Sequence, residues 1–165
     1  MIKILLMLPV LLFTVALFAD PITYLDANGK VIGTATIDDG VTTHRDASGK
    51  IIGSSFQNGP QISFRTPEGR VIGTASPNGS NITYRDARGR ISGTAVNDGK
   101  QITYRNRDSK IIGTATPSGN KTTYQNAAGR LLGSVTCGEN NDFTRDAFIF
   151  IVTSSITNFR ISFFE

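Results

Sequence analysis

The chain has 165 residues, of which 39% are hydrophobic and 18% are charged, and its formal net charge is +4. This length allows one domain of ordinary size, and the composition is neither that of a disordered chain nor that of a membrane-embedded one. Seventeen glycines predict many turns, and the single cysteine, Cys137, excludes a disulfide framework within the chain.

The N-terminal segment, residues 1–19, has the layout of a secretory signal peptide. Lys3 supplies a positive charge, Ile4–Phe18 is almost entirely apolar, and Ala19 offers a small residue for cleavage. The apolar run is short for a membrane span, so we expect cleavage rather than an uncleaved anchor, and no stable membrane span afterwards. Loss of Lys3 lowers the formal charge to about +3. The sequence thus predicts a secreted, periplasmic or cell-surface protein.

A 20-residue repeat organises the next segment, residues 20–147. A glycine, a base, and an aromatic side chain or histidine recur at this interval without a gap, which predicts six tandem copies in one domain. The recurring residues are Gly33, Gly53, Gly73, Gly93, Gly113 and Gly133; Lys30, Lys50, Arg70, Arg90, Lys110 and Arg130; and Tyr24, His44, Phe64, Tyr84, Tyr104 and Tyr124.

Each copy predicts a β-hairpin and a second turn that leads into the next copy. In the fourth copy the expected strands are Ile82–Asp86 and Arg90–Val96, with three-residue loops at Ala87–Gly89 and Asn97–Gly99. A loop that ends in glycine is typical of a type I turn followed by a residue with positive φ in a G1 bulge. We assign this role in the first loops to Gly29, Gly49, Gly69, Gly89 and Gly129, with Ser109 in the fifth copy.

Loop length then sets the register and the two faces of the sheet. Tyr84 is expected to pair with Ser92, and Thr83 with Gly93. Residues two apart share a face, so the aromatic positions fall with Ile32 and its equivalents on one face, which we interpret as the core. The recurring glycine falls on the other face. Cross-strand ion pairs are expected at the margin of the core face, namely Asp26–Lys30, Asp46–Lys50 and Asp86–Arg90.

The predicted fold class is all-β, with about twelve short antiparallel strands in one long meander of tandem hairpins. Sheets of that many strands curl, split or close. We favour a curled or wrapped sheet that buries its aromatic face against itself, and a flat single-layer sheet is the alternative. Strands of about six or seven residues are short of the roughly 9–11 that a membrane-spanning strand needs.

The repeat pattern stops after Ala147. Residues 148–165 are apolar and contain five phenylalanines, but they lack the turn glycine and the base that the register requires. Two explanations stay open. The segment is either a cap over the edge of the last hairpin or a chain end altered by, for example, a shifted reading frame.

The strings TYRDARGR, TYLDANGK and TTYQNAAGR, each followed by an apolar residue and later by a turn of the Pro-x-Gly type, resemble YD (RHS-type) repeats. The resemblance covers roughly Ile22–Ala147. It implies strips of β-hairpins like those of bacterial secreted and cell-surface proteins that bind carbohydrate or mediate contact between cells. Large members wrap into shells around toxin domains. This chain departs from them because arginine stands between tyrosine and aspartate, and because six copies are too few to enclose a shell.

No catalytic or metal-binding pattern emerges from the repeats, because a catalytic site needs differently specialised groups and a repeat offers the same ones. His44 occupies the aromatic position and is interpreted as a packing residue. Asp38–Gly40 lacks the ligand spacing of a calcium loop. We therefore expect no enzyme, no cofactor and no metal. Cys137 aligns with the start of the second loop and is expected to be exposed, where it is either incidental or able to pair with a second chain.

A row of arginines is the candidate ligand-binding feature. It lies on the face opposite the aromatic residues, alternates with aliphatic residues and has no acidic partner within the row. On alternate strands its members would stand roughly 9.6 Å apart, a spacing suited to a repeating anionic polymer. Alternatively, the side chains are solvated and lie over their aliphatic neighbours. The four residues are Arg45, Arg65, Arg85 and Arg105.

Together these features favour a secreted or surface-exposed repeat protein that acts by binding or as a structural element. The candidate partners are an anionic polysaccharide, lipopolysaccharide or another surface protein, and nucleic acid is disfavoured. The alternative is a fragment or truncated relative of a longer YD-like surface or toxin protein with no independent activity. The identity of the ligand and the oligomeric state stay open.

Overall fold

A computed structural model of the chain describes residues 21–138. The expected signal peptide and the apolar tail lie outside the described residues. All the regular secondary structure in 21–138 is β-strand. This part of the chain contains no helix of the length and apolarity needed to cross a membrane.

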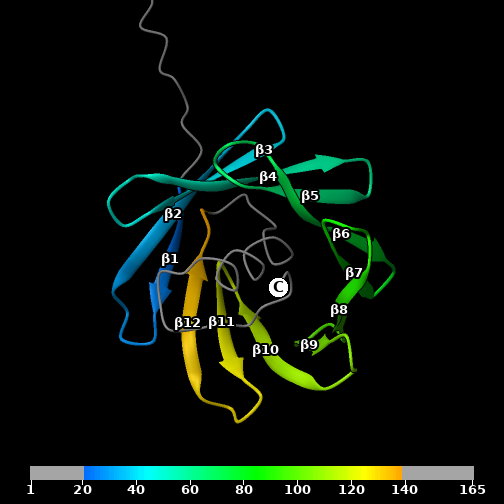
Figure 1. Ribbon diagram of the computed structural model, residues 1–165. Helices are drawn as coiled ribbons and strands as arrows, with labels where there is room; N and C mark the ends of the chain where they lie inside the picture. Colours follow the sequence, from blue (N-terminus) through cyan, green and yellow to red (C-terminus); the bar gives the residue numbers. More distant parts are fainter. Residues whose placement is uncertain (1–20, 139–165) are drawn as a thin grey trace, which may run out of the picture.

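Twelve antiparallel strands follow one another along the chain, two to each repeat (Figure 1). The prediction of an all-β meander of six tandem hairpins is therefore confirmed. The strands are β1 (Ile22–Asp26), β2 (Val31–Asp38), β3 (Val41–Asp46), β4 (Ile51–Asn58), β5 (Gln61–Arg65), β6 (Val71–Asn78), β7 (Asn81–Asp86), β8 (Ile91–Asn97), β9 (Ile102–Asn106), β10 (Ile111–Ser118), β11 (Lys121–Asn126) and β12 (Leu131–Thr136).

The sheet closes on itself, because β1 pairs with β12 and completes a barrel (Figure 1). At this seam Tyr24 pairs with Val135, just as His44, one copy later, pairs with Ala35 between β2 and β3. The first and last strands thus meet in the register that the other junctions between hairpins use. The expected curled or wrapped sheet is corrected to a closed barrel, which leaves none of the twelve strands at a free edge.

The first loop of each copy has the predicted geometry. In the fourth copy the N–H of Gly89 donates to the carbonyl of Asp86 at 2.9 Å, and the N–H of Asp86 donates to the carbonyl of Arg90 at 2.9 Å. The last loop residue has a positive φ in every copy, including Ser109 with φ of 64°. The assigned glycines have φ between 77° and 85° and are Gly29, Gly49, Gly69, Gly89 and Gly129.

The second loops differ from the three-residue turns that we expected. Five second loops join described strands, and in four of them only two residues connect the paired strand ends. Gly59, with φ of 58°, precedes Pro60 in a combination typical of a type II′ turn, whereas Asp39 and Gly40 both have positive φ, as a type I′ turn requires. These turns fit the right-handed twist of the strands, and that fit is why two residues suffice.

A β-bulge inside each hairpin shifts the predicted register by one residue. In the fourth copy Tyr84 pairs with Gly93 rather than Ser92, and Thr83 pairs with Thr94 rather than Gly93. Both predicted pairs are wrong, because Ser92 is an extra residue on β8 that has no partner opposite it. The recurring glycine therefore lies on the same face as the aromatic residues.

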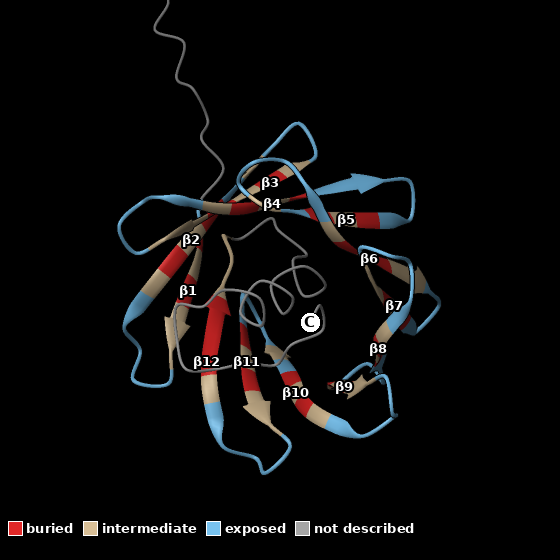
Figure 2. Ribbon diagram, viewed as in Figure 1, coloured by how far each residue is buried: buried red, intermediate tan, exposed pale blue. Residues whose placement is uncertain are grey.

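The aromatic face is the buried inner face of the barrel, as predicted for the core (Figure 2). The ring centroids of Tyr24 and His44 lie 6.1 Å apart, although their strands are two apart and roughly 9.6 Å would separate them on a flat sheet. The side chains therefore converge, as they do on a concave surface. Large and small residues alternate around the barrel, so that Tyr84 stands between Ala75 and Gly93 on its neighbours.

The glycine that follows the extra residue of the bulge, on the same strand, is required by the close approach of the next strand. A Cβ atom on Gly113 would lie 2.5 Å from the carbonyl oxygen of Gln125, and one on Gly33 would lie 2.5 Å from that of Arg45. Neither oxygen can move without disturbing the backbone of the neighbouring strand. Steric exclusion of any side chain thus explains why glycine recurs at this position, far from any turn.

Candidate binding surface

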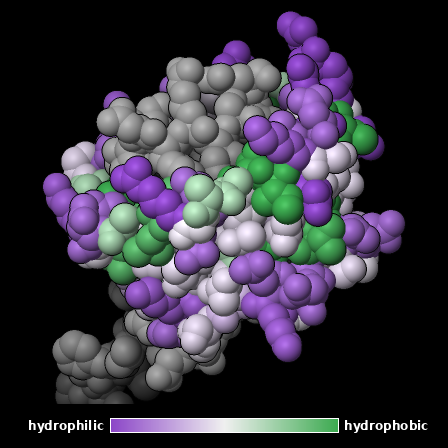
Figure 3. All heavy atoms as spheres, turned by 90° about the horizontal axis from the view of Figure 1, so that it is seen from below, coloured by the Kyte–Doolittle hydropathy of each residue, from purple (hydrophilic) through white to green (hydrophobic). Residues whose placement is uncertain are grey.

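The four predicted arginines lie on the outer face of the barrel, near the first loops. Arg85 pairs with Ile91 on β8 and with Thr74 on β6, both of which share its outward direction. The aliphatic partners of this row are 39–50% exposed. They are Val31, Ile51, Val71, Ile91, Ile111 and Leu131. Figure 3 shows that apolar side chains lie among polar ones on the surface of the protein.

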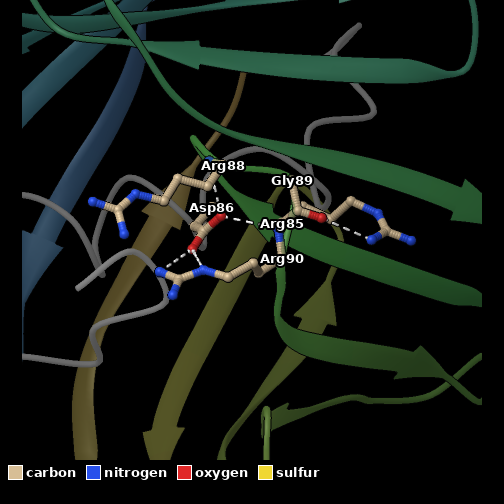
Figure 4. Close-up of polar contacts among 5 residues, drawn as sticks. All are labelled: Arg85, Asp86, Arg88, Gly89 and Arg90. Carbon is tan, nitrogen blue, oxygen red and sulfur yellow. Dashed lines mark hydrogen bonds and ion pairs between the residues drawn. The ribbon is translucent and has the colours of Figure 1, made fainter.

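Three of these arginines reach along their hairpin to the first loop. The Nη1 of Arg85 donates to the carbonyl oxygen of Gly89 at 2.9 Å (Figure 4). Arg45 makes the same contact at 3.1 Å with Gly49, and Arg105 makes it at 3.0 Å with Ser109. The contact uses one of the five N–H donors of a guanidinium, so the others remain available for an anion.

Closure of the barrel separates the arginines that the sequence placed in one line. Arg45 on β3 and Arg105 on β9 are six strands apart in a ring of twelve, so they lie on opposite sides of it. Twelve strands about 4.8 Å apart and tilted by about 40° give a backbone diameter of roughly 20–25 Å. A straight polymer segment can contact adjacent members such as Arg65 and Arg85, and only one that bends around the barrel reaches all four.

One end of the barrel, where all six first loops lie, carries most of the positive charge. We call it the basic end. Among residues 21–138 it holds twelve of the fourteen bases but only five of the eight acids. The bases are the four outer-face arginines with Lys30, Lys50, Arg70, Arg88, Arg90, Arg107, Lys110 and Arg130, and the acids are Asp26, Asp46, Glu68, Asp86 and Asp108.

The opposite end of the barrel has no such excess. Its described charged residues are Lys100, Lys121, Asp38, Asp39 and Asp98. We did not predict this asymmetry, although the sequence held the signal for it. A base closes the first loop of every copy, and alternate turns of an antiparallel meander lie at the same end.

The acids that begin the first loops act mainly as turn residues. Asp26 and Asp46 were expected to form ion pairs, but the Oδ1 of each accepts the backbone N–H of the lysine four residues later, at 2.9 and 3.0 Å. Asn106 and Asn126 accept the equivalent bonds, so this role needs no charge. The Ser48 hydroxyl, foremost, and the loop amides lower the pKa of Asp46 against the effect of burial.

The expected ion pair between Asp86 and Arg90 is confirmed. The Nε and Nη2 of Arg90 both lie 2.7 Å from the Oδ2 of Asp86 (Figure 4). Burial pushes the pKa of this carboxyl upward, but the bonds from the Arg90 side chain and from the loop amides, together with the charge of Arg90, lower it on balance. Asp86 therefore stays ionised and offsets the charge of Arg90.

His44 and Cys137 both contact the core. The Tyr24 hydroxyl lies 2.9 Å from the Nδ1 of His44, and burial lowers the pKa of His44 to about 3. Cys137 packs half-buried against the core and its N–H donates to the carbonyl of Asn120 at 2.8 Å, so the expected exposure is corrected. Within the described range, no three His, Cys, Asp or Glu side chains are grouped as metal ligands would be.

Comparison with known proteins bears on the fold. No protein-family model matches the sequence, and no curated protein matches it. Among solved structures, the chain is similar to a protein from Arabidopsis thaliana whose X-ray structure aligns with a TM-score of 0.51 and 13% sequence identity. The alignment covers 80% of this chain and 88% of that chain. At this identity the likeness concerns the fold alone.

Proposed function

We propose that the protein is a secreted binding protein without enzymatic activity, which holds anionic polymers, above all acidic polysaccharides, at the basic end of its barrel. The observation that carries this proposal is the unequal distribution of charge between the two ends. Twelve bases against five acids give the basic end a formal excess of seven positive charges within the described residues. Such a field attracts polyanions and raises the rate at which they associate.

A polymer suits this surface better than a small anion does. The bases are spread around the rim of the barrel, so a ligand with many charges can contact several of them in series. Each contact is exposed to solvent and weak by itself, and its strength falls as salt screens the charges. Arginine also pairs with a carboxylate or a phosphate through two parallel hydrogen bonds.

The chemistry of the outer face favours a polysaccharide over a nucleic acid. Proteins that hold single strands stack bases on exposed aromatic rings, whereas all four tyrosines of this chain are buried inside the barrel and tryptophan is absent. Among the described residues the one exposed aromatic ring is that of Phe56, which lies near the second loop of its copy, at the end of the barrel opposite the bases. The outer-face arginines alternate instead with exposed aliphatic side chains. Such side chains can contact the C–H faces of sugar rings while the arginines hold the acidic groups.

The test compares two double variants with the same loss of charge. Arg65→Gln with Arg85→Gln removes adjacent bases at the basic end, and Lys100→Gln with Lys121→Gln removes two bases at the opposite end. We expect the first variant to bind long polygalacturonate and heparin about tenfold more weakly at moderate salt, because a multivalent grip loses two contacts. The second variant should change the affinity by less than about twofold. Biolayer interferometry at several salt concentrations measures both.

Equal losses in the two variants would mean that only net charge attracts the polymer and that the basic end is not a site. Failure of the wild-type protein to bind either polymer at low salt would remove the proposed function altogether. The quadruple variant of Arg45, Arg65, Arg85 and Arg105 to Gln then asks whether a long chain wraps around the barrel. Wrapping predicts a further loss beyond the double variant.

A further inference from the structure

A cavity lies between two neighbouring hairpins at the basic end, those of the third and fourth copies. The pairing of strands β6 and β7 ends at Gly73 and Asp86, and the space lies beyond these residues, between the first loops of the third and fourth copies. The space has a volume of ≈ 450 Å³, and we call it the β6–β7 notch. It is lined by Arg70, Val71, Ile72, Asp86, Ala87, Arg88 and Arg90.

Within residues 21–138, two of the three arginines in the notch form no ion pair with a carboxylate. Arg90 is held by Asp86, whose side chain is only 14% exposed, and this pair is close to neutral. Neither Arg70 nor Arg88 lies within ion-pair distance of an acid among the described residues. Glu68 is on the same loop as Arg70, and the Thr66 hydroxyl, foremost, together with the charge of Arg70 lowers the pKa of its carboxyl, but Glu68 does not line the notch. The guanidinium groups of Arg88 and Arg70 are therefore available to a ligand in the notch, although Glu68 offsets part of the charge of Arg70.

The loop that carries Arg88 is held in place by its own hydrogen bonds. The Oδ1 of Asp86 accepts the backbone N–H groups of Arg88 and Arg90, both at 2.9 Å, and the N–H of Gly89 donates to the carbonyl of Asp86. Figure 4 shows the guanidinium groups of Arg88 and Arg90 on one side of the hairpin and that of Arg85 directed away from them. The notch is thus a separate site from the outer-face arginines, with a preordered backbone that reduces the entropic cost of binding.

We propose that the β6–β7 notch binds a single uronic acid unit of an acidic polysaccharide, with Arg88 and Arg70 on its carboxylate. This inference rests on the proposed function and names the unit that the basic end recognises. The side chains of Val71, Ile72 and Ala87 supply an apolar wall for the C–H face of the sugar ring. The volume lies within the roughly 300–1,000 Å³ usual for small-molecule sites.

The notch is distinct among the repeats because of one residue at the tip of its loop. The spaces between the other hairpins share the base that closes each loop, but Arg88 has no arginine equivalent in the other five copies. The whole basic end can thus hold a polymer, while the β6–β7 notch alone recognises one of its sugar units. The residues equivalent to Arg88 are Asn28, Ser48, Glu68, Asp108 and Ala128.

The test uses a galacturonate trisaccharide, which is too short to reach around the barrel. Arg70→Gln with Arg88→Gln should weaken its binding at least tenfold in isothermal titration calorimetry. The matched control is Arg107→Gln with Lys110→Gln, which removes one loop-tip arginine and one loop-closing base from the next hairpin. It should leave the affinity within about twofold, and thermal unfolding should show that both variants are folded.

A second ligand isolates the role of the carboxylate. The methyl-esterified trisaccharide keeps the shape of the sugar but has no charge, and we expect no measurable binding to the wild type. Equal binding of the ester, or equal losses in the two double variants, would overturn the assignment of the notch. Tighter binding of inorganic phosphate than of the galacturonate would overturn it in favour of a phosphate site.

The failure of this inference can be told apart from the failure of the proposed function. In one case the trisaccharide does not bind, or its affinity is unchanged by the loss of Arg70 and Arg88, while the affinity for long polygalacturonate still falls when Arg65 and Arg85 are replaced. The notch is then not a uronate site, but the basic end is still a binding site for the polymer. In the other case the affinity for the trisaccharide falls when Arg88 is replaced, while the affinity for long polymers is unchanged by the loss of the outer-face arginines. The notch is then the binding site and the outer face is not.

Discussion

His44 is the only ionisable side chain in the aromatic row whose usual pKa lies near neutrality, and it links stability to pH. Burial holds its pKa at about 3 in the folded protein, against 6.5 in an exposed histidine. Below pH 6.5 the unfolded chain therefore takes up a proton that the folded chain does not. The contribution of neutral His44 to stability is complete above pH 6.5 and is lost as the pH falls towards 3.

The first prediction at this scale compares the wild type with His44→Phe, which has the side chain that the third copy places there. On acidification from pH 7 to pH 4 the free energy of unfolding of the wild type should fall more than that of the variant. The difference between the two proteins should change by up to about 1.4 kcal/mol per pH unit below pH 6.5. Urea denaturation at pH 7, 5.5 and 4 measures it, and carboxylate effects cancel in the difference. A difference that does not vary with pH would show that His44 is accessible to protons.

Within each hairpin, glycine serves two purposes that have different physical causes. Gly129 closes a first loop with φ of 77°, and no atom lies within 4 Å of the position where a Cβ would be. Gly113 has no such torsion, but a Cβ there would collide with the carbonyl oxygen of Gln125. The first glycine is thus needed for conformation and the second for space.

This distinction predicts unequal costs for the same substitution. Gly129→Ala should lower the free energy of unfolding by about 1 kcal/mol, since Ser109 already shows that a side chain is tolerated at this torsion. Gly113→Ala should cost about 2 kcal/mol or more, because strands β10 and β11 must move apart. Urea denaturation at pH 7 compares them. A larger cost at Gly129 would mean that the bulge is not where the pairing of β9 with β10 places it.

The hairpins and their first loops could be predicted from the sequence because their determinants are local. The bulge could not be, because its extra residue, such as Ile112, is of the same aliphatic type as Ile111 beside it. The recurrence of glycine away from any turn was the available signal of a close approach. The prediction for the second loops was wrong because three-residue loops such as Gln57-Asn58-Gly59 were assigned by the position of glycine in the repeat, whereas the twist of the strands selects the two-residue turn Gly59-Pro60.

For the whole molecule, closure follows from the constancy of the repeat. Each junction between hairpins has the same offset, so the β1–β12 seam is equivalent to the junction of β2 with β3. The number of strands at which a sheet closes depends on its twist and curvature, and one copy of the sequence does not specify these. For the same reason the face of Arg45 was predicted correctly, but its separation from Arg105 was not.

The closed barrel predicts uniform protection of its backbone. An open sheet would leave half of the amides of β1 and β12 unpaired, and they would exchange with solvent rapidly. In the barrel, the amides of these strands should be protected from hydrogen exchange to the same degree as those of β7, which has neighbours on both sides. Exchange measured by NMR on uniformly labelled protein decides between the two. Rapid exchange confined to β1 and β12 would rule out the seam.

The crowding of bases at one end also gives the barrel an electric dipole along its axis. In the field of a polyanionic surface, such a dipole experiences a torque before any contact is made. The torque would rotate the molecule as it diffuses towards the surface, so that the β7–β8 loop and the other first loops make contact first. The axis of the barrel would then be perpendicular to the surface. Turns such as Asp39–Gly40 would then face the surrounding medium.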